Sequence, residues 1–228
     1  MLAVSDEEVV SLTAGTCRLQ PDVILGAGDL PAGYLEALVD RYSVPLVYVP
    51  GNHDPDMSGY RWTARGFVRA GMPAEPPGPR GGISADGAVV RVAGLTVAGL
   101  GGCIRYSGGP NQWTEAAQAR RAWRLRARAA RRGPVDVVLT HAPAAGVGDG
   151  PDAPHLGFAC VGKLVARLRP QVFVHGHVHP HGRRPADLAV PVPGGEVPVL
   201  NTVGYTYFDV TPGGDTSGVS VQERRYGA

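Results

Sequence analysis

The stretch PLVYVPGNHD, residues 45–54, decides the fold of this chain. Its first half is the apolar run LVYV, and continuous apolar runs of this length predict a strand buried on both faces. The run stops at Gly51, and the next three residues, Asn52, His53 and Asp54, have side chains that bind metal ions or protons. The fold therefore depends on whether other strands of the chain end in the same way.

Four further apolar runs end in polar residues of the same kinds. They are LAVS (2–5), followed by Asp6-Glu7-Glu8; DVILGA (22–27), followed by Gly28-Asp29; VVLT (137–140), followed by His141; and VFV (172–174), followed by HGHVH (175–179). In open α/β sheets, ligands bind outside the carboxyl ends of the strands. These strand ends are therefore expected to bring their side chains to one edge of the sheet.

Helical stretches separate these strands, at residues 31–42, 112–132 and 158–169. Strands that alternate with helices predict α/β layering. On the middle stretch, the side chains expected to pack form one stripe of Ala116, Ala119, Trp123, Ala127 and Ala130. The dense Arg face of the same stretch is interpreted as solvated surface.

Other segments predict antiparallel structure, so the sheet system is expected to be mixed. Residues 88–101 have the pattern of a hairpin that turns near Gly94, and residues 197–221 have an antiparallel pattern. The segments 55–82 and 181–196 are expected to form long loops, which in compact domains are often functional.

Length and composition favour a single domain, residues 1–228, without a nucleic-acid or membrane partner. The net charge is only +2, so no strong field attracts nucleic acid or an anionic bilayer. No apolar run approaches the roughly 20 residues of a membrane span, and the first residues do not have the pattern of a secretion signal. The three cysteines have no C-x-x-C spacing, and the expected location is the cytoplasm.

The polar strand ends together have the donor types of a metal centre. Asp, Asn and His ligands suit borderline divalent ions such as Mn²⁺, Fe²⁺ or Zn²⁺. Two ions about 3.5–4 Å apart need a bridging carboxylate, and Asp29 is well placed for that role. His177 and His179 are two residues apart, so they either face one side of a strand or, from a tight loop after Gly176, reach two different ions.

In these motifs the sequence resembles the calcineurin-like metallophosphoesterases. The signature of that family is D-x-H, then G-D, then G-N-H-D/E, then a lone His, then G-H-x-H, each after a strand. GNHD (51–54) and GHVH (176–179) are intact here, with GD (28–29) and His141 in the expected order. The resemblance covers nearly the whole chain, and it implies a four-layer α-β-β-α sandwich of two mixed β-sheets flanked by helices, with a dinuclear metal centre at one edge.

The resemblance also implies a role for each residue of the site. Asp29 would bridge two divalent ions, with Mn²⁺ expected first and Fe, Zn²⁺ or Ni²⁺ as alternatives. The other ligands would divide into Asp6 and His179 on one ion, and Asn52, His141 and His177 on the other. His53 would donate a proton to the leaving oxygen, and Asp54 would orient that histidine. The implied activity is hydrolysis of a phosphodiester or phosphomonoester by attack of metal-bound hydroxide.

The first motif departs from the family pattern, because Glu8 stands where the family has His. A Glu side chain can ligate Mn²⁺ or Fe, so Glu8 is kept as a candidate metal ligand. Two alternatives stay open: the first ion is held weakly, or Ser5 and Glu8 form a capping box at a helix N-terminus. The altered motif also gives weight to a different class of function, an inactive scaffold for protein assembly such as a retromer subunit of this fold.

Substrate contacts are expected from residues outside these motifs. Arg105 follows the predicted hairpin and is a candidate for clamping a phosphate, with a plain surface Arg as the alternative. His155 precedes the third helical stretch, so it either caps that helix or faces the cleft. His175 is interpreted as a packing residue and His181 as an exposed one. The expected substrate is a small phosphoester.

Overall fold

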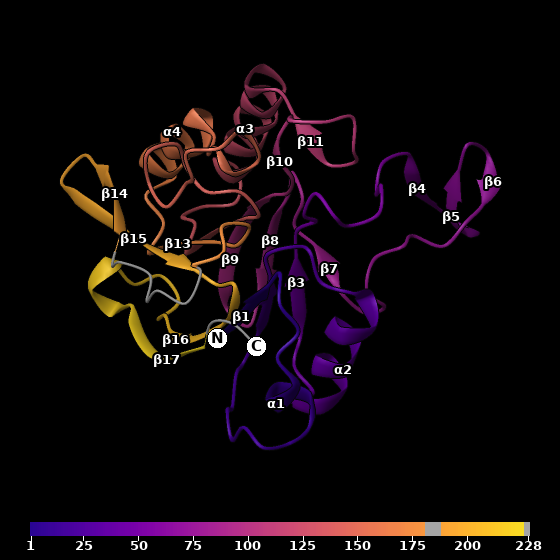
Figure 1. Cartoon of the computed structure of the whole chain (residues 1–228), viewed down its shortest axis with the longest axis horizontal. Helices are drawn as coiled ribbons and strands as arrows, with labels where there is room; N and C mark the ends of the chain where they lie inside the picture. Colours follow the sequence, from indigo (N-terminus) through magenta and orange to yellow (C-terminus); the bar gives the residue numbers. More distant parts are fainter. Residues whose placement is uncertain (181–187, 226–228) are drawn as a thin grey trace.

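The computed structural model describes residues 1–180 and 188–225. Within these residues, the first of two large sheets has the strand order β17-β16-β1-β2-β3-β7 (Figure 1). Its strands are β1 (Leu2–Ser5), β2 (Ile24–Gly26), β3 (Leu46–Tyr48), β7 (Ile83–Ser84), β16 (Gly204–Asp209) and β17 (Ser220–Arg225). Strands β1, β2, β3 and β7 run parallel, and β16 and β17 are antiparallel to their neighbours. The sheet is therefore mixed, as predicted.

The second large sheet has the order β14-β15-β13-β12-β9-β8. Its strands are β8 (Val89–Val92), β9 (Leu95–Leu100), β12 (Val137–Thr140), β13 (Val172–His175), β14 (Leu188–Val192) and β15 (Gly195–Asn201). The four central strands are parallel, and the antiparallel hairpins β8–β9 and β14–β15 close the two ends. The predicted hairpin over 88–101 is confirmed.

Helices cover the outer face of each sheet, which makes four layers (Figure 1). Helices α1 (Val10–Thr13) and α2 (Ala32–Tyr42) pack on the first sheet, and α3 (Glu115–Ala129) and α4 (Ala159–Leu168) pack on the second. Successive residues of a strand point to opposite faces, and both faces of these strands are buried. The α-β-β-α sandwich expected from the sequence is confirmed.

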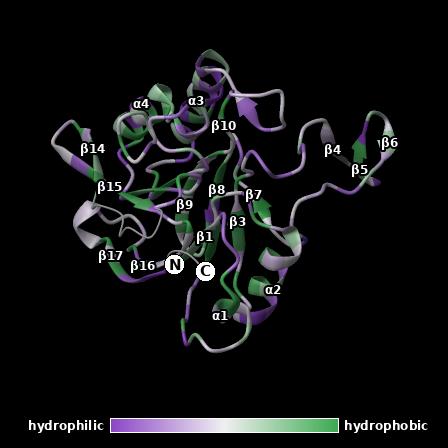
Figure 2. Cartoon of the chain, in the orientation of Figure 1, coloured by the Kyte–Doolittle hydropathy of each residue, from purple (hydrophilic) through white to green (hydrophobic). Residues whose placement is uncertain are grey.

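The alternation is visible within single strands. In β1, Leu2 and Val4 pack toward α1 and α2, whereas Ala3 packs between the two sheets. In β12, Leu139 packs between the sheets and Val138 faces α3 and α4. Figure 2 shows the resulting concentration of hydrophobic residues on interior strands such as β9 and β3.

Smaller elements lie outside the sandwich. A three-stranded sheet of β4 (Tyr60–Thr63), β5 (Gly66–Arg69) and β6 (Met72–Pro73) projects from one side of the molecule (Figure 1). The other short elements are β10 (Cys103–Ile104), β11 (Gln112–Trp113), η1 (Ala153–His155) and η2 (Thr216–Gly218). The prediction of one long loop over 55–82 is therefore wrong, because three short segments within residues 60–73 pair with one another.

Other expectations are corrected by the packing. Trp123 of α3 is 65% exposed, and the helix instead buries Gln118, Ala122, Leu125 and Ala129. The stripe was predicted from alanines, but the larger apolar side chain of Leu125 determines which face of the helix meets the sheet. The antiparallel pattern over 197–221 is only partly correct, since β15 and β16 belong to different sheets. Of the predicted loop over 181–196, residues 181–187 lie outside the described residues, and the rest enters the β14–β15 hairpin.

The capping-box alternative for Ser5 and Glu8 is also wrong. Ser5 is the last residue of β1, and α1 begins only at Val10, with Val9 as an N-cap that makes no side-chain hydrogen bond. In the part of the chain that the structure describes, no helix has the length and apolar character needed to cross a bilayer.

Candidate metal centre

Three parallel strands of the first sheet deliver polar residues to the same edge. The register aligns Val4 of β1 with Gly26 of β2, and Gly26 with Tyr48 of β3. Asp6, Asp29 and Asn52 follow these aligned positions, so they leave the sheet at its carboxyl edge.

The second sheet delivers its histidines to the same place. Strands β12 and β13 are parallel with Leu139 opposite Val174, so His141 and the GHVH segment (176–179) follow adjacent strand ends. The Gly176 N–H donates to the carbonyl of His141 at 3.0 Å. Two bonds then join the sheets: the His177 N–H donates to the Asp6 carboxylate at 2.9 Å, and Nδ1 of His141 lies 2.7 Å from the Ala27 carbonyl. The site is therefore part of the junction between the two sheets.

Four of these side chains form a compact donor cluster. One ligand atom from each of Asp6, Asp29, His141 and His177 lies within 4.8 Å of the others. Among the described residues, this is the one group in which three or more His, Cys, Asp or Glu side chains lie close enough to hold a metal ion together. Strand ends that are far apart in sequence thus form one site.

His141 is held in one orientation by its two ring nitrogens. It is completely buried, and Nδ1 donates to the Ala27 carbonyl. Nε2 then faces two acceptors, Oδ2 of Asp29 at 3.3 Å and Oδ1 of Asn52 at 3.0 Å. Burial alone would disfavour the imidazolium, but the carboxylates of Asp29 and Asp6 outweigh it and raise the pKa of His141 to about 9. Nε2 therefore sits where a positive charge, either a proton or a metal ion, is stabilised.

His177 is held differently. Its Nε2 lies 2.7 Å from the carbonyl of Pro154, which belongs to η1, so Nδ1 is left with the lone pair. Its ring lies beside His141, with 4.7 Å between the ring centroids. Burial lowers the pKa of His177 to about 3. A neutral imidazole with one anchored N–H is the form in which histidine ligates metals.

The carboxylates respond to burial and to these histidines in opposite ways. Burial raises the pKa of Asp6, and the nearby charge of His141 only partly offsets it. Burial would also raise the pKa of Asp29, but His141 and the His53 N–H reverse the direction and lower it. Asp29 is therefore the carboxylate whose charge this site already favours.

The backbone is strained at three of the four clustered residues. Asp6, Asp29 and His177 have φ angles of 59°, 56° and 69°. Non-glycine residues rarely adopt this left-handed region, at a cost of order 1–3 kcal/mol each, and such residues concentrate at functional sites. The strain follows from the sharp turns that bring the chain back across each strand end.

Two motif glycines are required by close approach. A Cβ on Gly51 would overlap the carboxylate of Asp29, and a Cβ on Gly176 would overlap Ser5 and the carboxylate of Asp6. The Gly of GNHD and the Gly of GHVH therefore make room for the carboxylates of neighbouring motifs.

The matches with known proteins agree with this architecture. The profile of the calcineurin-like phosphoesterases matches residues 7–181. The chain belongs to that family. A comparison with curated proteins gives no match.

Solved structures show the same fold. One crystal structure matches with a TM-score of 0.59 and 16% identity, covering 98% of this chain and 98% of its own. The crystal structure of TT1561 from Thermus thermophilus matches with a TM-score of 0.50 and 18% identity, covering 88% of each chain.

The family binds a dinuclear divalent metal centre, and the residues of this phosphoesterase fit such a group. With Nδ1–H of His141 bonded to Ala27, the lone pair of Nε2 converges with oxygens of Asp29 and Asn52. Three acceptor atoms at this separation repel one another unless a cation lies among them. This donor set of nitrogen and oxygen suits borderline divalent ions.

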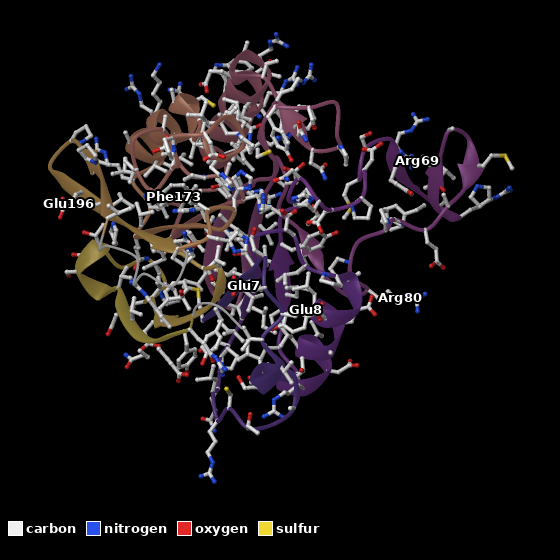
Figure 3. All side chains as sticks on the ribbon, in the orientation of Figure 1. Glu7, Glu8, Arg69, Arg80, Phe173 and Glu196 are labelled. Carbon is white, nitrogen blue, oxygen red and sulfur yellow. The ribbon has the colours of Figure 1, made fainter. Side chains whose placement is uncertain are left out.

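The first motif of this family member differs from the expectation. Glu8 is exposed and its charge acts on Tyr34 of α2, whereas Oε1 of Glu7 lies 3.0 Å from Nδ1 of His179 (Figure 3). The structure therefore does not bring Glu8 into the cluster, and Glu7 instead contacts His179 beside it. Side chains alternate between the two sides of an extended chain, but the left-handed turn at Asp6 changes which of Glu7 and Glu8 points toward His179. Nε2 of His179 lies 4.0 Å from Oδ1 of Asp6, so Glu7 anchors the far side of a ring that faces the cluster.

His53 and Asp54 lie at the rim of the cluster. The His53 N–H donates to Oδ1 of Asp29 at 2.8 Å, and its side chain is exposed. Oδ2 of Asp54 accepts N–H bonds from Gly51 at 2.7 Å and Asp29 at 3.0 Å. Among the described residues, no hydrogen bond joins Asp54 to the His53 ring. The Asp54 carboxylate holds the GD and GNHD turns together, and its role in orienting the His53 ring stays a prediction.

The predicted substrate contacts have different outcomes. His155 is close to the cluster, since its ring centroid lies 5.3 Å from that of His177 and its Nδ1 bonds Asp152. Arg105 is exposed, and the next residue, Tyr106, reaches the site instead, where its hydroxyl accepts from Nδ2 of Asn52 at 3.3 Å. The sequence indicated this segment, but its charge pointed to Arg105 and not to Tyr106. His175 is completely buried beside Phe173, and His181 lies outside the described residues.

Proposed function

We propose that this phosphoesterase hydrolyses phosphomonoesters or phosphodiesters at the cluster, with His53 as the proton donor to the leaving oxygen. The observation that carries this proposal is the link between His53 and Asp29. The backbone of His53 is fixed on the Asp29 carboxylate at 2.8 Å, while its ring stays exposed. An imidazole beside the donor cluster and open to a bound substrate is suited to general acid catalysis.

The donor atoms divide into two sets that share Asp29. Asn52, His141 and His177 would hold one ion with Asp29, and Asp6 and His179 would hold the other with Asp29. When bound, two divalent ions neutralise phosphate oxygens and lower the pKa of water at the site. Mn²⁺ is the first expectation, with Fe, Zn²⁺ and Ni²⁺ as alternatives, because carboxylate, amide and imidazole ligands suit this group of ions.

The remaining residues position this set. Tyr106 fixes the amide of Asn52 so that its oxygen faces His141, and Glu7 fixes the ring of His179. Asp54 fixes the two turns that carry Asp29 and His53. His155, whose ring lies beside that of His177, would contact the substrate, for which we propose a small phosphoester.

A leaving-group comparison tests the proposal. The wild type and His53→Ala are assayed with bis-p-nitrophenyl phosphate, p-nitrophenyl phosphate and phenyl phosphate in Mn²⁺. Loss of a general acid slows esters with poor leaving groups most, so phenyl phosphate hydrolysis should fall about 10²–10⁴-fold and p-nitrophenyl hydrolysis less. Glu8→Ala is the control, since Glu8 is exposed outside the cluster. Absence of turnover by the wild type with Mn²⁺, Ni²⁺, Co²⁺ and Zn²⁺, or equal turnover by His53→Ala, would contradict the proposal.

One observation favours a second function, a scaffold for protein assembly. Glu8 does not replace the family histidine in the cluster, so the side of the site that holds Asp6 has one ligand fewer. A scaffold needs no positioned acid, and wild-type protein that binds metal without hydrolysing any of these esters would favour it.

A further inference from the structure

An apolar cavity of about 390 Å³ opens directly beside His53. Four site residues, Gly28, Asp29, His53 and Asp54, form one end of its wall. The rest of the wall comes from the start of α2, from the end of β3 and from a Pro-rich segment, and includes Ala32, Leu35, Tyr48, Met57 and Pro77. The cavity therefore begins at the proposed proton donor and continues over apolar side chains.

The charged residues of the cavity wall indicate the charge of the ligand that the cavity can accept. The described residues that line this cavity include no Lys or Arg, and its carboxylates are those of Asp29 and Asp54. A second phosphate group, as in a nucleoside diphosphate, would find no Lys or Arg side chain on this wall to pair with. The cavity thus favours an uncharged ligand.

A larger cavity of about 960 Å³ continues from this one and shares Tyr48, Met57 and the segment 77–79 with it. It extends to Tyr60 and Phe67 of the projecting sheet, whose strand β5 is hydrophobic (Figure 2). Arg80 belongs to this second wall, but its side chain is 84% exposed, is paired with Glu75 and points away from the body of the molecule (Figure 3). Glu36, Glu75 and Ser84 also line this second cavity, so the part of its wall that extends the apolar surface is formed by Tyr60 and Phe67.

We propose that these cavities bind the leaving group of the substrate, and that this group is an uncharged, apolar alcohol with an aryl or alkyl body. The inference rests on the proposed function, because it takes His53 as the proton donor. In hydrolysis, the oxygen of water forms the new bond to phosphorus, and the bond from phosphorus to the leaving oxygen breaks with its electron pair on that oxygen. The proton from His53 converts this oxygen to a hydroxyl. The body of the leaving alcohol must therefore lie on the His53 side of the phosphorus, where the cavity opens.

Two esters with leaving groups of similar acidity test the inference by hydrolysis. We compare phenyl phosphate and 2-naphthyl phosphate, which differ mainly in apolar size, with Mn²⁺-loaded protein. Burial of the second ring should raise kcat/KM about tenfold for the naphthyl ester. Ala32→Leu narrows the cavity and should bring that ratio close to one. Ala37→Leu makes the same change on α2 at a residue that lines neither cavity, and should keep the ratio near ten.

A binding measurement separates this inference from the proposed function. The product alcohol 2-naphthol is titrated into metal-free protein and followed by its own fluorescence. Binding by the wild type and Ala37→Leu, with at least about fivefold weaker binding by Ala32→Leu, supports the cavity as the leaving-group site. Met57→Gln, which makes the wall polar, should weaken binding similarly and replaces Ala32→Leu if that variant does not fold.

The outcomes distinguish the two proposals. Hydrolysis of both esters at equal kcat/KM, with no naphthol binding, would overturn the leaving-group inference and leave the phosphoesterase activity intact. Naphthol binding without hydrolysis of either ester would overturn the proposed function and, with it, the assignment of the cavity to a leaving group.

Discussion

Nδ1 of His179 lies 3.0 Å from Oε1 of Glu7, and Nε2 on the opposite side of the same ring faces Asp6. The other oxygen of Glu7 is buried and has no hydrogen-bond partner among the described residues. A carboxylate behind a ligating histidine fixes the ring orientation and increases its basicity. Among the acidic residues after β1, Glu7 is therefore the one that would act on a metal centre through the His179 ring.

Glu7 and Glu8 form a matched pair for a metal-binding test. Glu7→Ala is expected to weaken the affinity of the site that contains His179 by about 10–100-fold, as is typical when the carboxylate behind a ligating histidine is lost. Glu8→Ala should leave both affinities unchanged, because Glu8 is exposed and outside the cluster. Calorimetric Mn²⁺ titration of the three proteins checks this. Equal weakening by both substitutions would show that the acidic segment acts only through its net charge.

The two metal sites are expected to differ in affinity. In the proposed assignment, Asp29, Asn52, His141 and His177 would hold one ion, and Asp6, Asp29 and His179, whose side chain is 40% exposed, would hold the other. A Mn²⁺ titration should therefore resolve one tight and one weaker ion, at least about tenfold apart. His141→Ala should remove the tight class and His179→Ala the weak class. Two classes of equal affinity in the wild type would mean that the missing family histidine has no consequence for metal binding.

The strand ends and their order could be predicted from sequence because each signal is local. An apolar run followed at once by Asp29, Asn52 or His141 identifies both the strand and the candidate ligand. The α/β layering also followed from strands that alternate with helices, whereas the four layers were implied by the resemblance to the calcineurin-like metallophosphoesterases.

The choice between Glu7 and Glu8 could not be made in the same way. Asp6 has a φ of 59°, and this left-handed turn determines which of the next two side chains points back toward His179. The turn is fixed by Gly28 and His177 contacts that come from distant parts of the chain. Tyr106 was missed for a related reason, because its contact with Asn52 spans 54 residues and leaves no periodic pattern.

Substitutions of Asp54 test whether its carboxylate stabilises the two turns by accepting hydrogen bonds or by its negative charge. A single oxygen, Oδ2, accepts both the Gly51 and the Asp29 N–H, and burial raises the pKa of this carboxyl. Asp54→Asn keeps one amide oxygen for both bonds, so its metal-free unfolding free energy should fall by less than about 1 kcal/mol. Asp54→Ala leaves both donors unpaired and should lose about 2–3 kcal/mol. Urea unfolding in the presence of a chelator measures both, and an equal loss in the two variants would show that charge, rather than acceptance of the two bonds, is what matters.

Acid should destabilise the metal-free protein through His175. Its ring is completely buried, Nδ1 bonds the Gly176 carbonyl at 2.9 Å, and Nε2 has no partner among the described residues. Burial lowers the pKa of His175 to about 4, whereas the unfolded chain titrates near about 6.5. The unfolded state therefore binds the proton first as the pH falls through this range, and the unfolding free energy should decrease by up to about 3 kcal/mol between pH 6.5 and pH 4.

A variant isolates this contribution from the other histidines. His175→Asn keeps an N–H that can donate to Gly176 and removes the titration, so its unfolding free energy should depend less steeply on pH than that of the wild type. Some slope should remain, because burial also lowers the pKa of His177, to about 3. Urea unfolding at several pH values between 7 and 4.5, with chelator present, gives both curves. Parallel curves for the two proteins would mean that His175 takes up its proton equally in the folded and unfolded states.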